Sequence, residues 1–173
     1  MSAYEDNREK TMEKIIIRPA KDDDLEKMKQ ISVEAWEPIY ESLRNAMGDE
    51  LFAAIHSDWQ TDKSAQVAGH YKSYPEYTLI TEYDGQVVGF ITYGLSERKK
   101  LGIIGNNAIR PEYQGKGLGT KQYQRVLEIF KEKGMLYAEV TTGLDKAHAP
   151  ARVAYEKVGF KPIFSSIRYY KKL

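Results

Sequence analysis

A glycine-rich segment in the middle of the chain has the composition of an anion-binding loop. Residues 114–120 read Gln-Gly-Lys-Gly-Leu-Gly-Thr and follow a short apolar run at 103–109. The first N–H groups of a helix lack internal partners, and glycines let a backbone approach a ligand closely, so a strand, such a loop and a helix together can hold a phosphate. The residues after the loop repeat at the spacing of one helix face: Tyr123, Val126, Leu127 and Phe130.

The order of the loop residues excludes two common phosphate-binding motifs. A Walker loop needs Gly-Lys followed by Ser or Thr, whereas the order at Thr120 is Gly-Thr-Lys. The dinucleotide fingerprint GxGxxG also fails, because the glycines stand at 115, 117 and 119. The pattern that remains is Gln-x-x-Gly-x-Gly, formed by Gln114, Gly117 and Gly119.

This pattern resembles the acetyl-coenzyme A pyrophosphate loop of the GNAT acetyltransferase superfamily. The resemblance implies that backbone groups at Ala108 and Ile109 hold the thioester carbonyl and the pantetheine amides of acetyl-CoA. Taken alone, the loop could also be a glycine-rich turn without a ligand. The resemblance implies these loop contacts to the cofactor: Gln114, Gly115, Lys116, Gly117, Leu118, Gly119 and Thr120.

A second motif begins at His148 and ends at Gly159-Phe160. It is similar to the late GNAT helix, Asn-x-x-Ala-x-x-Leu-Tyr-x-x-x-Gly-Phe, with His148 in place of the asparagine and Ala154 in place of the leucine. The resemblance implies that Tyr155 protonates the departing thiolate and that His148 stands where the pantetheine arm is contacted. The alternatives are a core aromatic for Tyr155 and an exposed residue for His148.

Acyl transfer from a thioester to an amine needs a neutral amine, donors for the oxyanion and a proton for the thiolate. Some GNAT members place a glutamate on the strand before the glycine loop, but residues 103–109 contain no carboxylate. Asn106 or Asn107 could position a water or the acceptor amine instead, and we take Asn107 as a substrate-binding residue. No base is assigned, because four glutamates elsewhere are better explained as solvated charges: Glu34, Glu82, Glu97 and Glu139.

The segment from Glu34 to Asp62 is the candidate acceptor region. It holds seven acids and one base, with aromatic residues interleaved. An acidic, aromatic surface suits a cationic amine through charge pairing and cation–π contact, and Trp36 and Tyr40 are the predicted acceptor contacts. The alternative, which we favour, is a solvated helix face formed by Glu34, Glu37 and Glu41.

Composition limits the classes of partner and site. The formal net charge of +1 gives no reason to expect nucleic acid or membrane as a partner. The absence of cysteine excludes a thiolate metal site and an acyl-cysteine intermediate. The three histidines are widely separated in the sequence, so we expect no metal site. No signal-peptide pattern or membrane-length apolar run is present, so we expect a cytoplasmic protein.

The order of expected elements gives the fold. We expect residues 1–13 to form a polar tail and residues 14–173 to form one domain. A chain of 173 residues has an ordinary length for a single domain. A helix from Leu25 is expected to break at Pro38, and Asp84-Gly85 predicts a hairpin turn. One or two strands are expected at 163–170. This order predicts an α/β (α+β) domain with a mixed sheet, and it resembles the GNAT fold, a mostly antiparallel central sheet flanked by helices.

The resulting functional expectation is an acetyl-CoA-dependent N-acetyltransferase. Without cysteine, the acetyl group would pass directly to a primary amine, either a small amine such as a polyamine or a protein N-terminus or lysine. Homodimers are common in the resembled family. The alternative is a non-catalytic acyl-CoA-binding sensor or assembly subunit.

Overall fold

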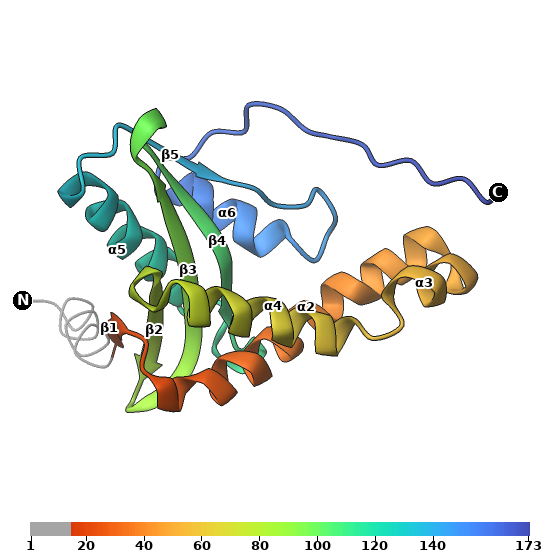
Figure 1. Cartoon of the computed structure of the whole chain (residues 1–173), viewed down its shortest axis with the longest axis horizontal. Helices are drawn as coiled ribbons and strands as arrows, with labels where there is room; N and C mark the ends of the chain where they lie inside the picture. The colour runs from red at the N-terminus through yellow and green to blue at the C-terminus, as the bar shows by residue number, and fades with distance from the viewer. Residues whose placement is uncertain (1–14) are drawn as a thin grey trace, which may run out of the picture.

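In a computed structural model of the protein, the described residues are 15–173, so the tail expected at 1–13 lies outside them. One five-stranded sheet forms its centre (Figure 1). Neighbouring strands pair antiparallel, except for the last pair, which is parallel. This arrangement confirms the predicted mixed, mostly antiparallel sheet. The strands, in both chain and sheet order, are β1 (Ile15–Pro19), β2 (Thr78–Tyr83), β3 (Gln86–Ser96), β4 (Leu101–Ile109) and β5 (Tyr137–Val140).

Helices cover both faces of the sheet (Figure 1). Adjacent strand residues face opposite ways, so Ile80 packs with α2 and α4, whereas Leu79 packs with α5 and α6. The helices α2, α3 and α4 also extend beyond the sheet as an arm (Figure 1). The helices are α2 (Leu25–Met47), α3 (Asp49–His56), α4 (Trp59–Ser73), α5 (Leu118–Glu132) and α6 (Ala149–Lys157), with short 3-10 turns η1 (Asp22–Asp24), η2 (Pro75–Tyr77), η3 (Glu97–Lys99) and η4 (Pro111–Tyr113).

The helix break expected at Pro38 is wrong, because α2 continues through it to Met47. Proline removes one helical hydrogen bond and crowds the preceding turn, which disfavours but does not forbid a continuous helix. Packing holds both halves of α2. Before the proline, Ile31 lies in the core with α4, and after it, Tyr40 stacks on Trp59 at 4.2 Å between ring centroids. Tertiary contacts on both sides therefore outweigh the local cost.

The predicted hairpin at Asp84-Gly85 is confirmed. Asp84 has φ of 51° and Gly85 has φ of 75°, so both central residues of the turn are left-handed. A type I′ turn requires this geometry, and its twist matches that of the strands it joins.

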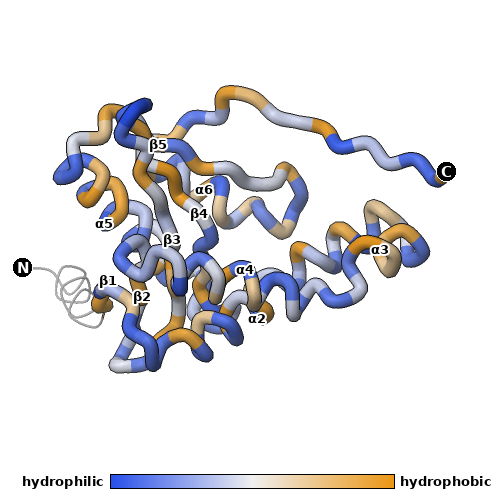
Figure 2. Tube along the Cα trace, in the orientation of Figure 1, coloured by the Kyte–Doolittle hydropathy of each residue, from blue (hydrophilic) through white to orange (hydrophobic). Residues whose placement is uncertain are grey.

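The strands expected at 163–170 are wrong. Residues 161–173 form neither helix nor strand, and all of them are exposed. Figure 2 shows that this exposed segment nevertheless carries several hydrophobic stretches. The apolar pattern that suggested strands is real, but this segment has no neighbouring strand in the described chain.

Candidate functional site

The candidate site lies where β4 and β5 separate. The two strands pair from Leu101 with Tyr137 to Ile104 with Val140, and the pairing then ends. Residues 105–109 of β4 therefore continue without a β5 partner, while β3 still covers their other edge. A ligand with amide groups can pair with a strand edge of this kind.

Two consecutive asparagines of β4, next to a bulge, face opposite sides of the sheet and meet different partners. Tyr93 pairs with Ile104 and Ile91 pairs with Asn107, so two β4 residues stand opposite Thr92 alone. Glycine is required at this point, because a Cβ on Gly105 would lie 2.6 Å from the Thr92 hydroxyl oxygen. Asn106 contacts α4 on one face of the sheet, and Asn107 contacts α5 and α6 on the other.

The predicted cofactor loop forms the turn between β4 and α5. Gly115 and Gly117 have φ of 76° and 80°, a conformation that glycine adopts readily and other residues rarely do. No atom lies within 4 Å of a Cβ built on either glycine, so the loop is open on that side. The first bond into α5 runs from the Lys121 N–H to the Gly117 carbonyl at 3.1 Å, and the preceding N–H groups of Gly119 and Thr120 have no helical acceptor.

Glutamine side chains tie this loop and helix to β4. The Gln114 amide donates to the Ile109 carbonyl at 3.0 Å. The buried Gln122 amide donates to the Thr81 hydroxyl at 2.8 Å and to the Ala108 carbonyl at 3.4 Å. The two predicted backbone positions, Ala108 and Ile109, are therefore fixed relative to the loop.

The remaining loop side chains take different directions. Leu118 is buried against Val88 and Ile109, which anchors the start of α5. The Lys116 ammonium lies 5.0 Å from the Tyr113 ring centroid and 5.3 Å from that of Tyr83. Its charge therefore stays beside the loop, at the surface.

Tyr155 lies on α6, and its side chain reaches the point where β4 and β5 separate. The Asn107 side-chain nitrogen donates to the Tyr155 hydroxyl at 3.1 Å, and the Asn107 oxygen accepts from the Tyr123 hydroxyl at 2.8 Å. The two phenol rings lie 4.6 Å apart. Predicted residues Tyr155 and Asn107 thus lie in direct contact, with Tyr123 as a third member.

Burial keeps both phenols protonated. Desolvation raises the pKa of Tyr155 above its ordinary value, although hydrogen bonds from Asn107 and Tyr123 act in the opposite direction. Burial also raises the pKa of Tyr123, as does the neighbouring Tyr155. A protonated phenol at this position can donate a proton or a hydrogen bond.

His148 stands at the start of α6 and is held there by Asp145. The Nδ1 atom of His148 lies 2.6 Å from an Asp145 carboxylate oxygen, and the His148 N–H donates to the other oxygen at 3.2 Å. Burial alone would raise the pKa of Asp145, but the hydrogen bonds from His148 outweigh it and lower the pKa. The imidazole is therefore oriented by its own loop.

Lys63, on α4, is a buried cation that the sequence analysis did not identify. Its side chain lies inside the protein, and the residue is 6% exposed. Its ammonium donates to the Asn106 side-chain oxygen at 2.6 Å and to the Gln66 side-chain oxygen at 2.8 Å, and lies 3.7 Å from the Trp36 ring centroid. Burial lowers its pKa to about 8. The spacing of Trp59, Lys63, Val67 and Tyr71 on one helix face was the available signal.

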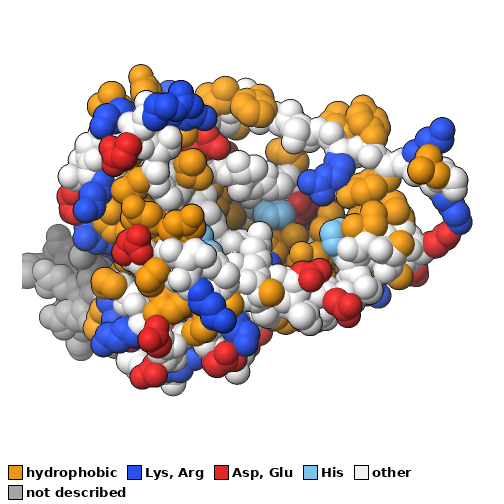
Figure 3. All heavy atoms as spheres, in the orientation of Figure 1, with side chains coloured by type: hydrophobic (Ala, Val, Ile, Leu, Met, Phe, Trp, Pro, Cys, Tyr) orange, Lys and Arg blue, Asp and Glu red, His pale blue; other side chains and the backbone are white. Residues whose placement is uncertain are grey.

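The two predicted acceptor aromatics occupy different surroundings. The Trp36 ring already faces the ammonium of Lys63, so its cation–π position is filled by the protein itself. Tyr40 stacks on Trp59 in the arm. It lines a hollow of about 430 Å³ between α2, α3 and α4, together with Glu37 and Glu41 among others. In Figure 3 the surface is hollowed between the sheet and the arm, and the C-terminal segment passes above.

The comparison with known proteins assigns the family. The model described as the Acetyltransferase (GNAT) family matches residues 35–160. The chain belongs to the GNAT acetyltransferase family. This match confirms the resemblance found in the glycine loop and the late helix.

Two relatives whose names describe N-acetyltransferases agree with the GNAT assignment. An uncharacterized N-acetyltransferase of Archaeoglobus fulgidus is 34% identical over 70 residues, covering 38% of this chain and 48% of the relative. An N-alpha-acetyltransferase of Sulfurisphaera tokodaii is 31% identical over 114 residues, covering 58% of this chain and 66% of the relative. The matched parts thus span about half to two thirds of these relatives.

The fold is shared with a solved GNAT structure. The PaiA N-acetyltransferase of Thermoplasma acidophilum, in complex with coenzyme A, superposes with a TM-score of 0.71 and 20% sequence identity. The superposition covers 88% of this chain and 92% of that one. At this identity the likeness shows the fold alone.

Most of the glutamates considered as bases have cationic partners in this GNAT domain. Glu82 lies 2.6 Å from Arg18, Glu97 lies 3.2 Å from Lys100, and Glu34 lies 3.7 Å from Arg110. Glu139 is exposed on β5. Lys63, by contrast, contacts Asn106, the neighbour of the Asn107 that holds Tyr155.

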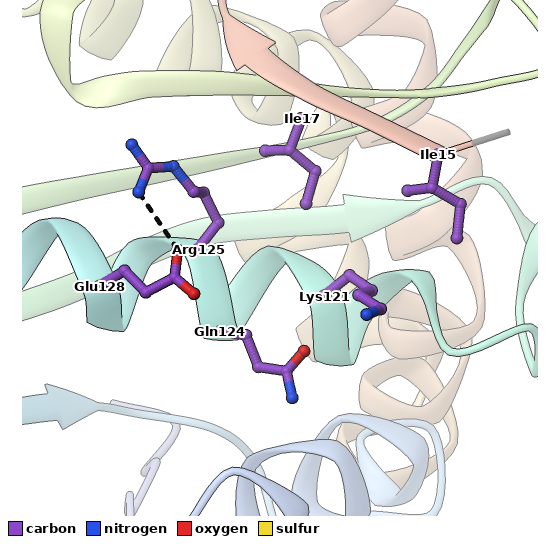
Figure 4. Close-up of a pocket in the computed structure, with 6 residues that line it drawn as sticks. All are labelled: Ile15, Ile17, Lys121, Gln124, Arg125 and Glu128. Atoms are coloured by element: carbon purple, nitrogen blue, oxygen red, sulfur yellow. Dashed lines mark hydrogen bonds and ion pairs between the residues drawn. The ribbon is translucent and has the colours of Figure 1, made fainter. Parts of the chain in front are cut away.

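Another hollow lies away from the β4–β5 separation. A hollow of about 280 Å³ between β1 and α5 is lined by Lys121 and by the paired Arg125 and Glu128 (Figure 4). Among residues 15–173, no cluster of three or more His, Asp or Glu could hold a metal ion. None of the helices in the described range has the length and apolar character needed to cross a membrane.

Proposed function

We propose that the protein is an acetyl-CoA-dependent N-acetyltransferase that passes the acetyl group directly to a primary amine. The observation that carries this proposal is the protonated Tyr155 phenol, held by Asn107 where β4 leaves β5, with the open glycine loop following on the same strand. Relatives named as N-acetyltransferases and the coenzyme A complex of the PaiA enzyme support it. A cytoplasmic location is part of the same proposal.

The cofactor would lie along β4 and the glycine loop. The pyrophosphate fits the positive end of α5, where Gly119 and Thr120 present N–H groups without helical acceptors. The pantetheine amides would pair with the uncovered edge of β4 near Ala108 and Ile109. His148, fixed by Asp145 at the start of α6, would flank the arm. No metal is required by this arrangement.

Tyr155 would act as the acid of the transfer. The neutral amine attacks the thioester carbon, a C–N bond forms and the C–S bond breaks. Tyr155 gives its phenolic proton to the leaving sulfur, and the proton lost by the amine passes to solvent, from which the phenolate is reprotonated. The chain contains no cysteine, so the transfer takes place in a ternary complex.

Lys63 and Asn106 would organise the acceptor side. The ammonium of Lys63 holds the Asn106 side-chain oxygen, which turns the Asn106 amide N–H groups away from α4. These N–H groups could then position the acceptor. The acceptor itself would be a small amine such as a polyamine, or a protein N-terminus or lysine; the name of the Sulfurisphaera relative favours an N-terminus.

Calorimetric titration with acetyl-CoA tests the cofactor site. Gly117→Glu places a bulky anion at the proposed pyrophosphate position, and we expect clear binding by the parent and its loss in the variant. Gly134→Glu is a matched control, because Gly134 also has positive φ (71°) and open space at its Cβ, but stands after α5. Equal loss in both variants, or no binding by the folded parent, would contradict the loop assignment.

Thiol release with a panel of amine acceptors tests the transfer. We expect Tyr155→Phe to lower kcat by about 100-fold or more, the range typical of a lost general acid. Tyr123→Phe removes the other phenol that bonds Asn107, and should cost less. Unchanged turnover in Tyr155→Phe would remove the acid assignment, whereas cofactor binding without turnover of any acceptor would favour the sensor or assembly-subunit alternative.

A further inference from the structure

Arg110 directly follows β4 and carries a buried nitrogen that is not hydrogen-bonded. Its Nε atom has no hydrogen-bond partner among residues 15–173, and the nearby carboxylate of Glu34 on α2 lies 3.7 Å from it. Other arginines are better satisfied, because Arg125 donates two hydrogen bonds to carboxylates and Arg152 donates two to backbone carbonyls. A buried donor without an acceptor is unfavourable, and a ligand that supplies the acceptor would explain it.

The guanidinium of Arg110 can hold a second carboxylate beside that of Glu34. Arg18 shows this in the same protein, since it donates to Asp24 and to Glu82 at once. The ion pair of Arg110 with Glu34 is made at Nε. The two terminal nitrogens of Arg110 form the planar fork that binds a carboxylate with two parallel hydrogen bonds.

Arg110 lies on the same face of the sheet as the buried Lys63. Side chains alternate along a strand, so Asn106, Ala108 and Arg110 share one face of the chain. Asn106 bonds Lys63 on α4. Ala108 lies in the core with residues of α2 and α4, and Arg110 approaches Glu34 on α2. The face that α2 and α4 cover thus carries two cations, in line with the stretch of β4 that leaves β5.

The proposed acid lies on the other face of the sheet. Tyr155 reaches β4 from α6 and bonds Asn107, whose side chain faces α5 and α6. If the leaving sulfur takes its proton on that face, the acceptor amine approaches from the face of α2 and α4. There it meets Lys63 and Arg110, which together with Glu34 give a net positive charge when Lys63 is protonated. Such surroundings favour an acceptor that brings a negative charge.

We propose that Arg110 binds a carboxylate of the acceptor, so that the substrate is a primary amine that also carries a carboxylate. This inference rests on the proposed function, because it names the acceptor class of that transfer. Arg110 stands four residues beyond Asn106, about 13 Å along an extended strand. The amine and the carboxylate are therefore several bonds apart, as in an ω-amino acid or in a peptide N-terminus followed by an acidic side chain. A polyamine would instead bring a second cation to Arg110.

Three acceptors of similar length test whether a carboxylate is recognised. The compounds 6-aminohexanoate, 6-aminohexanamide and 1,6-diaminohexane share the reacting amine and differ in the group at the far end. We expect kcat/KM, measured by thiol release, to be about 10- to 100-fold higher for the carboxylate than for the amide, the range for a hydrogen bond to a charged group. The diamine should have the lowest value. Equal values for the carboxylate and the amide would overturn the proposal.

Arg110→Met assigns the preference to this side chain. In the variant, kcat/KM for 6-aminohexanoate should fall to the value of the amide, while the value for the amide stays unchanged. Arg98→Met is the matched control, because it removes an exposed arginine from η3, before the other end of β4, and should keep the preference. An equal loss for all three acceptors in Arg110→Met would show that Arg110 supports the fold, and would overturn the proposal.

Calorimetry distinguishes an acceptor carboxylate from a phosphate of the cofactor. Acetyl-CoA should bind Arg110→Met as tightly as it binds the parent. Weaker binding of acetyl-CoA would assign the anion at Arg110 to the cofactor, and would overturn the proposal.

A second titration separates this proposal from the proposed function. Here 6-aminohexanoate is titrated into the complex of the protein with coenzyme A, whether or not any acceptor turns over. Binding that Arg110→Met loses, in a protein that transfers no acetyl group, would support the carboxylate site and remove the transferase function. If the parent does not bind 6-aminohexanoate, the carboxylate site is overturned even when other amines are acetylated.

Discussion

Arg18 and Lys63 are two cationic side chains that the fold takes largely out of solvent, and they are treated in opposite ways. Arg18, on β1, makes hydrogen bonds to both carboxylate oxygens of Asp24 at 2.6 and 2.9 Å, and a further one to Glu82 at 2.8 Å. Among residues 15–173, the ammonium of Lys63, on α4, contacts the neutral oxygens of Asn106 and Gln66 and the ring of Trp36, and has no ion pair. One charge is balanced and the other is not.

The pKa shifts follow from this difference. The hydrogen bond from Arg18 holds the pKa of Asp24 below its ordinary value, despite an opposing effect of burial. Burial lowers the pKa of Lys63 to about 8, and no carboxylate in the part of the chain that the structure describes offsets this shift. A balanced cluster is typical of a structural role, whereas an uncompensated buried cation beside a candidate site is typical of a functional one.

The largest expected effect is on stability, from Arg18→Met. It leaves the buried Asp24 carboxylate without its cation, and we expect the free energy of unfolding to fall by about 3 kcal/mol. This is the lower end for a broken buried pair, because the Arg18 side chain is 23% exposed. Urea titration measures it. Arg125→Met, which breaks an exposed pair with Glu128, is the control and should change stability by less than about 1 kcal/mol.

The next effect is on catalysis, from Lys63→Met. Removing an unbalanced buried cation in favour of an apolar side chain of similar length should leave stability unchanged or raised. Asn106 would lose the donor that orients it, and we expect kcat to fall by about 10- to 100-fold. Lys72→Met, at an exposed site on the same helix, is the control. A large loss of stability with normal kcat in Lys63→Met would show that Lys63 is structural, like Arg18.

The smallest effect is the pH dependence of stability. Between pH 8 and 10.5, the unfolded chain keeps the Lys63 proton that the folded protein has lost, so the contribution of Lys63 to stability rises with pH across this window. The raised pKa values of Tyr123 and Tyr155 act in the opposite direction as the pH approaches 10. Asp24 acts in the acid range. Its contribution to stability is present above pH 3.8, the ordinary pKa of the carboxyl, and is lost as the pH falls further. Urea titrations over pH compare the parent with each variant. The difference in stability between the parent and Lys63→Met should change with pH only in the alkaline range, and that between the parent and Arg18→Met only in the acid range. A difference that does not depend on pH would contradict the assignment.

Much of the fold could be predicted from the sequence because it is written in local patterns. The Asp84-Gly85 hairpin follows from the positive φ that both residues tolerate, and α5 follows from apolar residues at helical spacing. The break at Pro38 was wrong because contacts on either side of it, far away in the sequence, hold α2 straight through. Local preference is a small free energy, and packing can exceed it.

The prediction of strands at 163–170 was wrong for a related reason. These residues have strand preference, but a strand exists only when another strand pairs with it, and that partner is absent from the described chain.

The sequence by itself determined the family, the glycine loop at 114–120 and the position of Tyr155 on the late helix, because each depends on residue types at fixed short spacings. Only the tertiary structure decided which side chains meet. Beside the bulge at Gly105, Asn106 contacts Lys63 and Asn107 contacts Tyr155, across separations of 43 and 48 residues. The pKa of Lys63 likewise depends on burial, which no local pattern fixes. Contacts between distant segments form only when the core packs, and the burial and neighbours that determine each pKa are fixed by that packing.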